Sequence, residues 1–362
     1  MIRKPILEQL EARTLLAIDI LYSASDTEHV AIAPGIPQEY SAKAEISADV
    51  GPRLNWPGDE ENYFVYADLS AYIIHSGPIT GSITVTTTMY GVSLAAESHI
   101  SASGHLRYLE ARATLVITGY GDVEVHAGWT ANTEKDRDFS CCGDYVSHEN
   151  YFAGTTGQFS VVAHGSFQIT ITAHTHYLET DTLQMATPAG QAYDTMYADH
   201  ANASMELDAR APRYSVVAYG RTRVYLDQIW GSPTELAEAH KFAYGELNLP
   251  SLNGRGAFSA KLMSDSARYL GGGTNPWGRT NEYTATAAIS LGRAGRGVEG
   301  NIATEVQYND QGTRRDVNLR RTRNGSPELE QSACGYCQGD QAINEEVFSN
   351  IENWLLPLLL TL

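Results

Sequence analysis

The chain has 362 residues, of which 43% are hydrophobic and 19% charged, and its formal net charge is −18 at pH 7. This length is enough for about two ordinary domains or for one large β-sandwich. The negative charge repels nucleic acid and anionic membranes, so it argues against a nucleic-acid partner. The sequence contains no apolar run of 18 residues, which argues against a transmembrane helix.

The N-terminal segment has features of an export signal, but it fits a standard signal peptide poorly. Acidic residues interrupt the apolar stretch that follows Arg3 and Lys4. Residues 7–17 instead resemble the LEPR-x-LL segment near the N-terminus of many exported planctomycete proteins, with Ala12 where that family often has proline. The match consists of Leu10, Glu11, Arg13, Leu15 and Leu16.

This resemblance implies export and sorting to the cell surface, and therefore an extracellular or cell-surface location. It covers about the first twenty residues and implies no activity for the rest of the chain. The alternative is that the segment is an ordinary first strand or helix, because residues 109–115 repeat nearly the same letters in the interior of the chain.

From Ser41 onward, the sequence alternates with a period of two and is rich in Thr, Val, Ile and Tyr. Within 83–90, for example, odd-numbered residues fall on one face of a strand and even-numbered residues on the other. Such alternation predicts an all-β fold, an antiparallel β-sandwich or a jelly-roll-like arrangement. Further strands are expected near 62–74, 92–103, 106–118, 121–129, 158–176, 196–209, 213–227, 241–249, 256–263, 281–291, 298–308 and 313–323.

Two short helices and one hairpin are also expected. Ser232-Pro233-Thr234-Glu235 has the residue order of a capping box and predicts a helix near 233–242. Apolar residues recur every four positions near 341–355, which predicts a C-terminal helix. Asn309, Asp310 and Gly312 favour a tight turn between two strands at 308–313.

The sequence resembles itself at an offset of about 98 residues, where 109–113 matches 207–211. This similarity predicts a duplicated β unit, although Ser/Thr/Ala-rich strands also resemble one another by composition. The predicted organisation is a sorting segment and linker (1–40), a first β-sheet unit (41–130), a second unit (131–230), and a helical and β region that completes the fold (231–362).

Asp122, Glu124 and His126 alternate with valines, so they lie on one face of a strand. Three interpretations remain open: a solvated charged face, a site for a metal ion, and a pair of catalytic carboxylates, Asp122 and Glu124, suited to glycoside hydrolysis. His174 and His176 also share a face and can bind a metal. A complete ligand set would need a further residue, such as His126 or His164.

The four cysteines are Cys141, Cys142, Cys334 and Cys337. In an exported chain they predict disulfides, including a pairing between the two loops. Structural zinc and free or locally paired thiols are the alternatives.

Aromatic residues give the strongest hint of binding, since the chain has 21 Tyr and 5 Trp. Trp56 and Trp277 are the candidate binding residues, because an amphipathic ring can stack on a sugar or contact a protein. Trp129 and Trp230 are expected mainly in the core. The sequence therefore predicts a secreted or surface module that binds polysaccharide or another surface protein, with no cofactor. The alternative is an extracellular β-jelly-roll polysaccharide hydrolase.

Overall fold

The computed structural model describes residues 16–34, 39–50, 59–75, 78–97, 102–141, 145–185, 193–230, 237–271, 280–293, 298–309, 312–323 and 326–335. All secondary structure in these ranges is β, and every strand pairing is antiparallel. The prediction of an all-β antiparallel fold is confirmed. The strands are β1 (Leu16–Ile32), β2 (Tyr40–Val50), β3 (Asp59–His75), β4 (Thr80–Glu97), β5 (Ala102–Cys141), β6 (Tyr145–Met185), β7 (Tyr193–Trp230), β8 (Ala237–Gly271), β9 (Thr280–Arg293), β10 (Val298–Asn309), β11 (Gly312–Arg323) and β12 (Ser326–Gly335).

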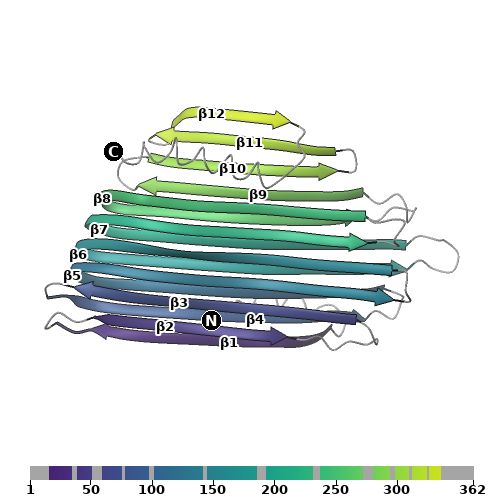
Figure 1. Cartoon of the computed structure of the whole chain (residues 1–362), viewed down its shortest axis with the longest axis horizontal. Helices are drawn as coiled ribbons and strands as arrows, with labels where there is room; N and C mark the ends of the chain where they lie inside the picture. Colours follow the sequence, from purple (N-terminus) through teal and green to yellow (C-terminus); the bar gives the residue numbers. More distant parts are fainter. Residues whose placement is uncertain are drawn as a thin grey trace.

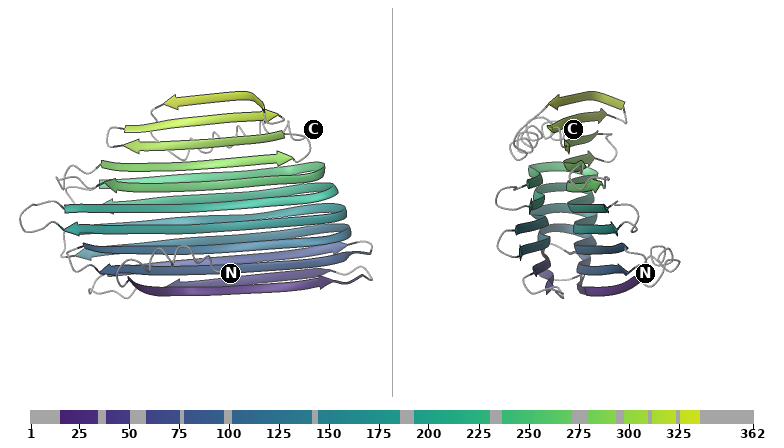
Figure 2. Two further views of the ribbon diagram at one scale, coloured as in Figure 1. Left: turned by 180° about the vertical axis from the view of Figure 1, so that it is seen from behind. Right: turned by 90° about the vertical axis from the view of Figure 1, so that its right-hand side faces the viewer.

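Strands β5 to β8 are 35 to 41 residues long, and each bends once in the middle. The first half of β5 pairs with β4 and the second half with β3. One half of every long strand therefore lies in a first layer and the other half in a second layer, and the two layers are visible in the right-hand view of Figure 2. The result is a sandwich made by folding one sheet upon itself.

The first layer contains β1, β4, one half of each long strand, and β9 to β12. The second layer contains β2, β3 and the other halves. Strands β9 to β12 extend the first layer alone, beginning where β9 pairs with residues 258–271 of β8.

Glycines mark three of the bends. Gly121, Gly165 and Gly256 have φ values of +135°, +84° and +87°, a region that other residues rarely adopt. Gly121 lies opposite Gly165 in the register of β5 and β6. In β7 the buried positions change from odd to even numbers across Pro212 and Arg213, where the pairing with both neighbours is irregular. This bulge adds one residue without exchanging the inner and outer faces.

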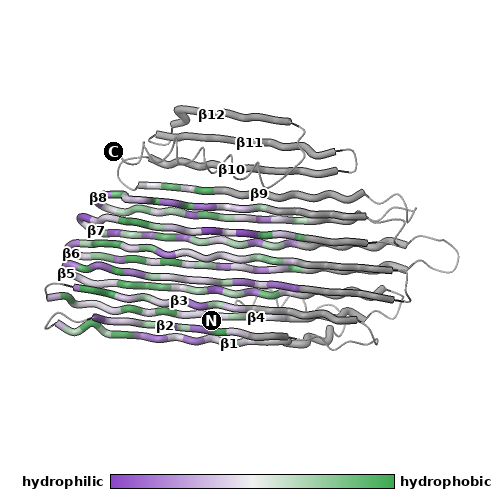
Figure 3. The backbone as a smooth tube through the Cα atoms, viewed as in Figure 1, coloured by the Kyte–Doolittle hydropathy of each residue, from purple (hydrophilic) through white to green (hydrophobic). Residues whose placement is uncertain are grey.

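The core lies between the layers and follows the predicted alternation. Ile83, Val85, Thr87 and Met89 are buried, while the intervening residues face outward. Many inner positions carry alanine next to larger residues such as Leu115. Figure 3 shows hydrophilic and hydrophobic colours alternating along the strands.

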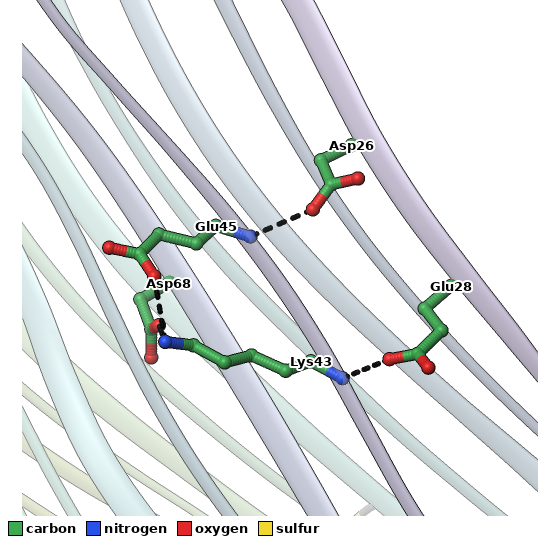
Figure 4. A network of polar contacts seen from close by, with 5 residues as sticks. All are labelled: Asp26, Glu28, Lys43, Glu45 and Asp68. Carbon is green, nitrogen blue, oxygen red and sulfur yellow. Dashed lines mark hydrogen bonds and ion pairs between the residues drawn. The ribbon is translucent and has the colours of Figure 1, made fainter.

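The two edge strands β1 and β2 meet through side chains at the open end of the sandwich. Glu28 of β1 accepts a hydrogen bond from the backbone N–H of Lys43 (2.5 Å), and Asp26 accepts one from the N–H of Glu45 (3.1 Å). The Lys43 ammonium lies 2.7 Å from Glu45 and 3.4 Å from Asp68 (Figure 4). These carboxylates satisfy the outward amides of β2, which would otherwise offer an edge for another strand.

The helix prediction is wrong for residues 237–242, which form the start of β8 and pair with β7. Pairing with a neighbouring strand outweighs the local capping signal there. The predicted C-terminal helix, 341–355, lies outside the described residues. The predicted hairpin is confirmed, since Asn309 of β10 lies opposite Gly312 of β11.

The predicted boundary between residues 130 and 131 falls inside β5. The unit that recurs in the described sheet is a single bent strand. Leu115 of β5 pairs with Ile171 of β6, and Ile171 pairs in turn with Leu207 of β7. Leu115 and Leu207 therefore occupy equivalent places on β5 and β7, 92 positions apart in the sequence. Two successive bent strands thus have about the length of the predicted repeat, and a common origin for them stays a prediction.

Candidate functional site

The predicted acidic strand lies just after the bend of β5, on the outer face of the second layer. Val123 and Val125 are buried on the inner side. The Asp122 carboxylate lies 3.0 Å from Nδ1 of His164, and the Glu124 carboxylate lies 3.0 Å from Nε2 of His126. All four side chains are between 45% and 64% exposed. Each carboxylate therefore has a histidine partner on an open surface.

His174 and His176 lie on the outer face of the first layer, in the second half of β6. His126 lies on the outer face of the second layer, in the second half of β5. The structure thus separates His126 from the histidine pair with which the sequence grouped it. No set of three or more His, Cys, Asp or Glu side chains within the described ranges is arranged to hold a metal ion.

His174 is held by a carboxylate from the neighbouring strand. Its Nε2 lies 3.0 Å from Oε1 of Glu110, and the Tyr108 hydroxyl donates to Oε2 of Glu110 at 2.8 Å. The hydrogen bond from His174 is the main cause that lowers the pKa of Glu110, against the effect of burial. Burial, followed by the charge of Glu110, raises the pKa of Tyr108.

His176 contacts a histidine that sequence analysis missed. Its Nε2 lies 3.1 Å from Nδ1 of His200 on β7, and Nε2 of His200 lies 2.5 Å from the Asp265 carboxylate on β8. Burial and the neighbouring His200 and His174 lower the pKa of His176 to about 4. The rings of His174 and His176 are 5.4 Å apart, and those of His176 and His200 are 5.0 Å apart. We call these three residues the histidine row.

The outer face of the second layer carries a second cluster that sequence analysis missed, built from arginines and aromatic rings. The guanidinium of Arg223 lies 5.8 Å from the Phe152 ring and 5.1 Å from the Tyr225 ring. The two rings stack on each other, with centroids 5.3 Å apart. A Cβ atom at Gly154 would come within 2.4 Å of Phe152, so this glycine gives the ring its space.

Arg221 repeats the arrangement two residues earlier on β7. Its guanidinium lies 6.0 Å from the Tyr219 ring and 5.4 Å from the Tyr244 ring. Glu246 lies 3.9 Å from Arg221 and accepts a hydrogen bond from the Tyr244 hydroxyl. Burial and this bond to Glu246 raise the pKa of Tyr244. We call Arg221, Arg223 and their four flanking rings the arginine–aromatic face.

Both arginines are exposed, and the rings are partly buried. The sequence signal for this face is that every second residue in 219–225 is Tyr or Arg, which places all four on one side of the strand. Its partners on β6 and β8 become visible only when the strand register is known.

Several predicted residues fall outside the described part of the chain. These are Trp56, Trp277, Cys142, Cys337 and the sorting residues Leu10, Glu11, Arg13 and Leu15; Leu16 is the first residue of β1. Trp129 is buried in the core, as expected, and its ring packs against Gly157.

The backbone positions of two cysteines are described. Cys141 ends β5, and Cys334 lies in β12, seven strands further along the sheet. Strands in a sheet lie about 4.8 Å apart, which separates the two by roughly 34 Å along the sheet. The sheet order gives no support to a bond between Cys141 and Cys334, and the other pairings stay predictions.

The described chain is a β-sandwich made from one sheet of bent antiparallel strands. Its two outer faces carry different side chains: the first layer has the histidine row and the second layer has the arginine–aromatic face. Within its described residues, the chain has no helix able to cross a membrane. Comparison with protein-family models, curated proteins and solved structures found no match.

Proposed function

We propose that this chain is an exported, cell-surface binding protein that binds acidic polysaccharide on the arginine–aromatic face. The observation that carries the proposal is the pair of exposed guanidiniums, Arg221 and Arg223, each flanked by two aromatic rings.

The net charge of −18 opposes a polyanion over most of the surface, but the local charge of Arg221 and Arg223 suits a carboxylated or sulfated sugar. A guanidinium presents a planar set of N–H donors that matches a carboxylate or sulfate, and flanking rings reduce its freedom before the ligand arrives. Aromatic side chains also offer apolar surface to the C–H groups of a sugar ring. Neighbours two apart on a strand lie roughly 7 Å apart, so the two cations form a short row.

Two further features support the proposal. The first supports binding over hydrolysis, and the second supports an extracellular location. The two layers stack against each other along the length of the sheet (Figure 2). Asp122 and Glu124 lie on the open surface, each beside a histidine. The resemblance of residues 7–17 to a sorting segment supports export.

A polysaccharide array that includes neutral, uronate-containing and sulfated chains tests the proposal. We expect binding to the acidic chains that weakens as salt rises, because charge contacts are screened. The double variant R221Q/R223Q should lose at least tenfold in affinity. R255Q, which removes one exposed cation at the bend of β8, should bind like the wild type.

Three other outcomes would change this proposal. Unchanged binding by R221Q/R223Q would overturn the assignment to this face. A blank array would leave the surface-protein partner as the better hypothesis. Reducing ends released from a bound polysaccharide, measured with and without chelator, would instead favour the hydrolase.

A further inference from the structure

The histidine row is separate from the arginine–aromatic face, since it lies on the opposite layer. Its three imidazoles come from neighbouring positions: His174 and His176 are two apart on β6, and His200 lies diagonally across on β7. Two of the ring nitrogens point at each other, Nε2 of His176 and Nδ1 of His200, 3.1 Å apart.

This separation is close to that of two nitrogens that bind one metal ion, so a small widening would be enough. Zinc–nitrogen bonds of about 2.0–2.1 Å at tetrahedral angles place two ligand nitrogens roughly 3.4 Å apart. We propose that His176 Nε2 and His200 Nδ1 together bind a divalent transition-metal ion of the zinc and copper class, with water in the remaining coordination positions.

Asp265 supports this role for His200. Its carboxylate lies 2.5 Å from Nε2, on the far side of the His200 ring. The negative charge of this carboxylate favours the tautomer of His200 that carries its proton on Nε2 and its lone pair on Nδ1, the role that second-shell carboxylates have for metal-binding histidines. The lone pair of His200 therefore points toward His176.

His174 is engaged elsewhere, because its Nε2 lies against Glu110. The site consequently has two protein ligands, which agrees with the lack of a three-residue metal group among the described side chains. Imidazole pairs favour borderline ions, and the affinity order places Cu²⁺ above Zn²⁺ and Ni²⁺. Calcium and magnesium, which prefer oxygen ligands, should not bind here.

Metal binding changes the proton position on His176. Without a metal, one of the two facing nitrogens donates a proton to the other, and the charge of Asp265 beside His200 Nε2 favours His176 Nε2 as that donor. When Nε2 binds the ion, the neutral ring carries its proton on Nδ1, a buried atom with no hydrogen-bond partner among the described residues. The tautomer of His176 is thus a specific readout.

Calorimetric titration of the full chain with Zn²⁺ is the first test, with Mg²⁺ as the control ion. We expect H176A and H200A each to lose one ion per chain or at least tenfold in affinity, and D265N to lose about 10–100-fold. H126A removes a surface histidine that also lies beside a carboxylate and should leave this site intact. All variants keep the same cysteines, so any thiolate site is common to them.

NMR of ring-labelled histidine is the second test and does not depend on the variants folding. In the wild-type chain, Zn²⁺ should switch His176 from the Nε2–H to the Nδ1–H tautomer and shift His200, while His126 stays unchanged. Zinc affinity that is equal in wild type, H176A and H200A would overturn the proposal. So would histidine spectra that zinc leaves unaltered.

Discussion

Tyr151 and Tyr177 stack face to face inside the sandwich, with ring centroids 5.1 Å apart and planes inclined by 15°. Both belong to β6, where they lie 26 positions apart on either side of the bend at Gly165. One strand thus supplies both sides of a core contact. The stack joins the two layers through side chains, far from the bend.

Replacing Tyr177 by alanine should lower the free energy of unfolding by about 3 kcal/mol, in the range found for large aromatic residues in cores. The side chain is 1% exposed, and its loss removes the stacking partner of Tyr151. Denaturant unfolding followed by circular dichroism measures the change. Y120A is the matched control, because Tyr120 is 67% exposed; an equal loss in both variants would contradict the role of the stack.

The sequence predicted the strands well but not their continuity. Residues 106–118 and 121–129 were expected as two strands, whereas they are parts of one strand that passes through Gly121. A glycine in an alternating pattern normally suggests a turn or a bulge. Here it bends the chain while the odd residues on both sides stay buried, and no local signal distinguishes this bend from a turn.

The candidate sites were harder to predict because they depend on register. Asp122, Glu124 and His126 share a face through alternation along one strand, which sequence alone specifies. His200 and Tyr244 contact their partners across strands, and a one-residue slip would turn either side chain to the opposite face. At the bulges in β7 and β8, the buried positions change from odd to even residue numbers. Which side chains meet across strands therefore becomes known only from the strand register in the structure.

Substituting alanine for Gly121 should destabilise the fold by about 1–3 kcal/mol, the range for a strained backbone residue. Its φ is +135°, and an added Cβ would lie 2.8 Å from the carbonyl oxygen of Pro78. Thermal and denaturant unfolding measure the effect.

Gly128 provides the matched control on the same strand. A Cβ there would meet no atom closer than 3.8 Å, so G128A should be neutral or should stabilise by up to about 1 kcal/mol through the unfolded state. If G121A is as stable as G128A, the bend does not depend on glycine.

Removing the two carboxylates at the open end, in D26A/E28A, should expose the edge of β2. The N–H groups of Lys43 and Glu45 would lose their acceptors, so their hydrogen exchange should accelerate. The N–H of Ala44 points toward β3 by the alternation of an antiparallel pair and should change little. Light scattering should also detect self-association, because an unpaired edge can accept another strand.

E206Q removes one negative charge from the outer face of the first layer, away from the edge of β2, because Glu206 lies on β7 and is exposed. This variant tests whether a change in net charge alone affects the edge. E206Q should self-associate no more than the wild type and leave the exchange of Lys43 and Glu45 unaltered. Unchanged exchange at both amides in D26A/E28A would show that the carboxylates do not protect this edge.

Asp208 should make stability depend on pH in the direction opposite to most carboxylates. Burial and the charge of Glu206 raise its pKa in the folded protein, partly offset by Arg210. The folded state therefore binds this proton more tightly than the unfolded chain does, and the stabilising effect disappears as the pH rises through the raised pKa. D208N, which cannot ionise, should be more stable than wild type at pH 7 and equally stable below the carboxyl range; because Asp208 is partly exposed, solvent screening keeps this difference small. The gain should shrink in an E206Q background, because one cause of the raised pKa is then absent.

Unfolding measured from pH 3 to 8 tests the sign of this effect. A stability advantage of D208N that is constant with pH would show that the ionisation of Asp208 is not its cause.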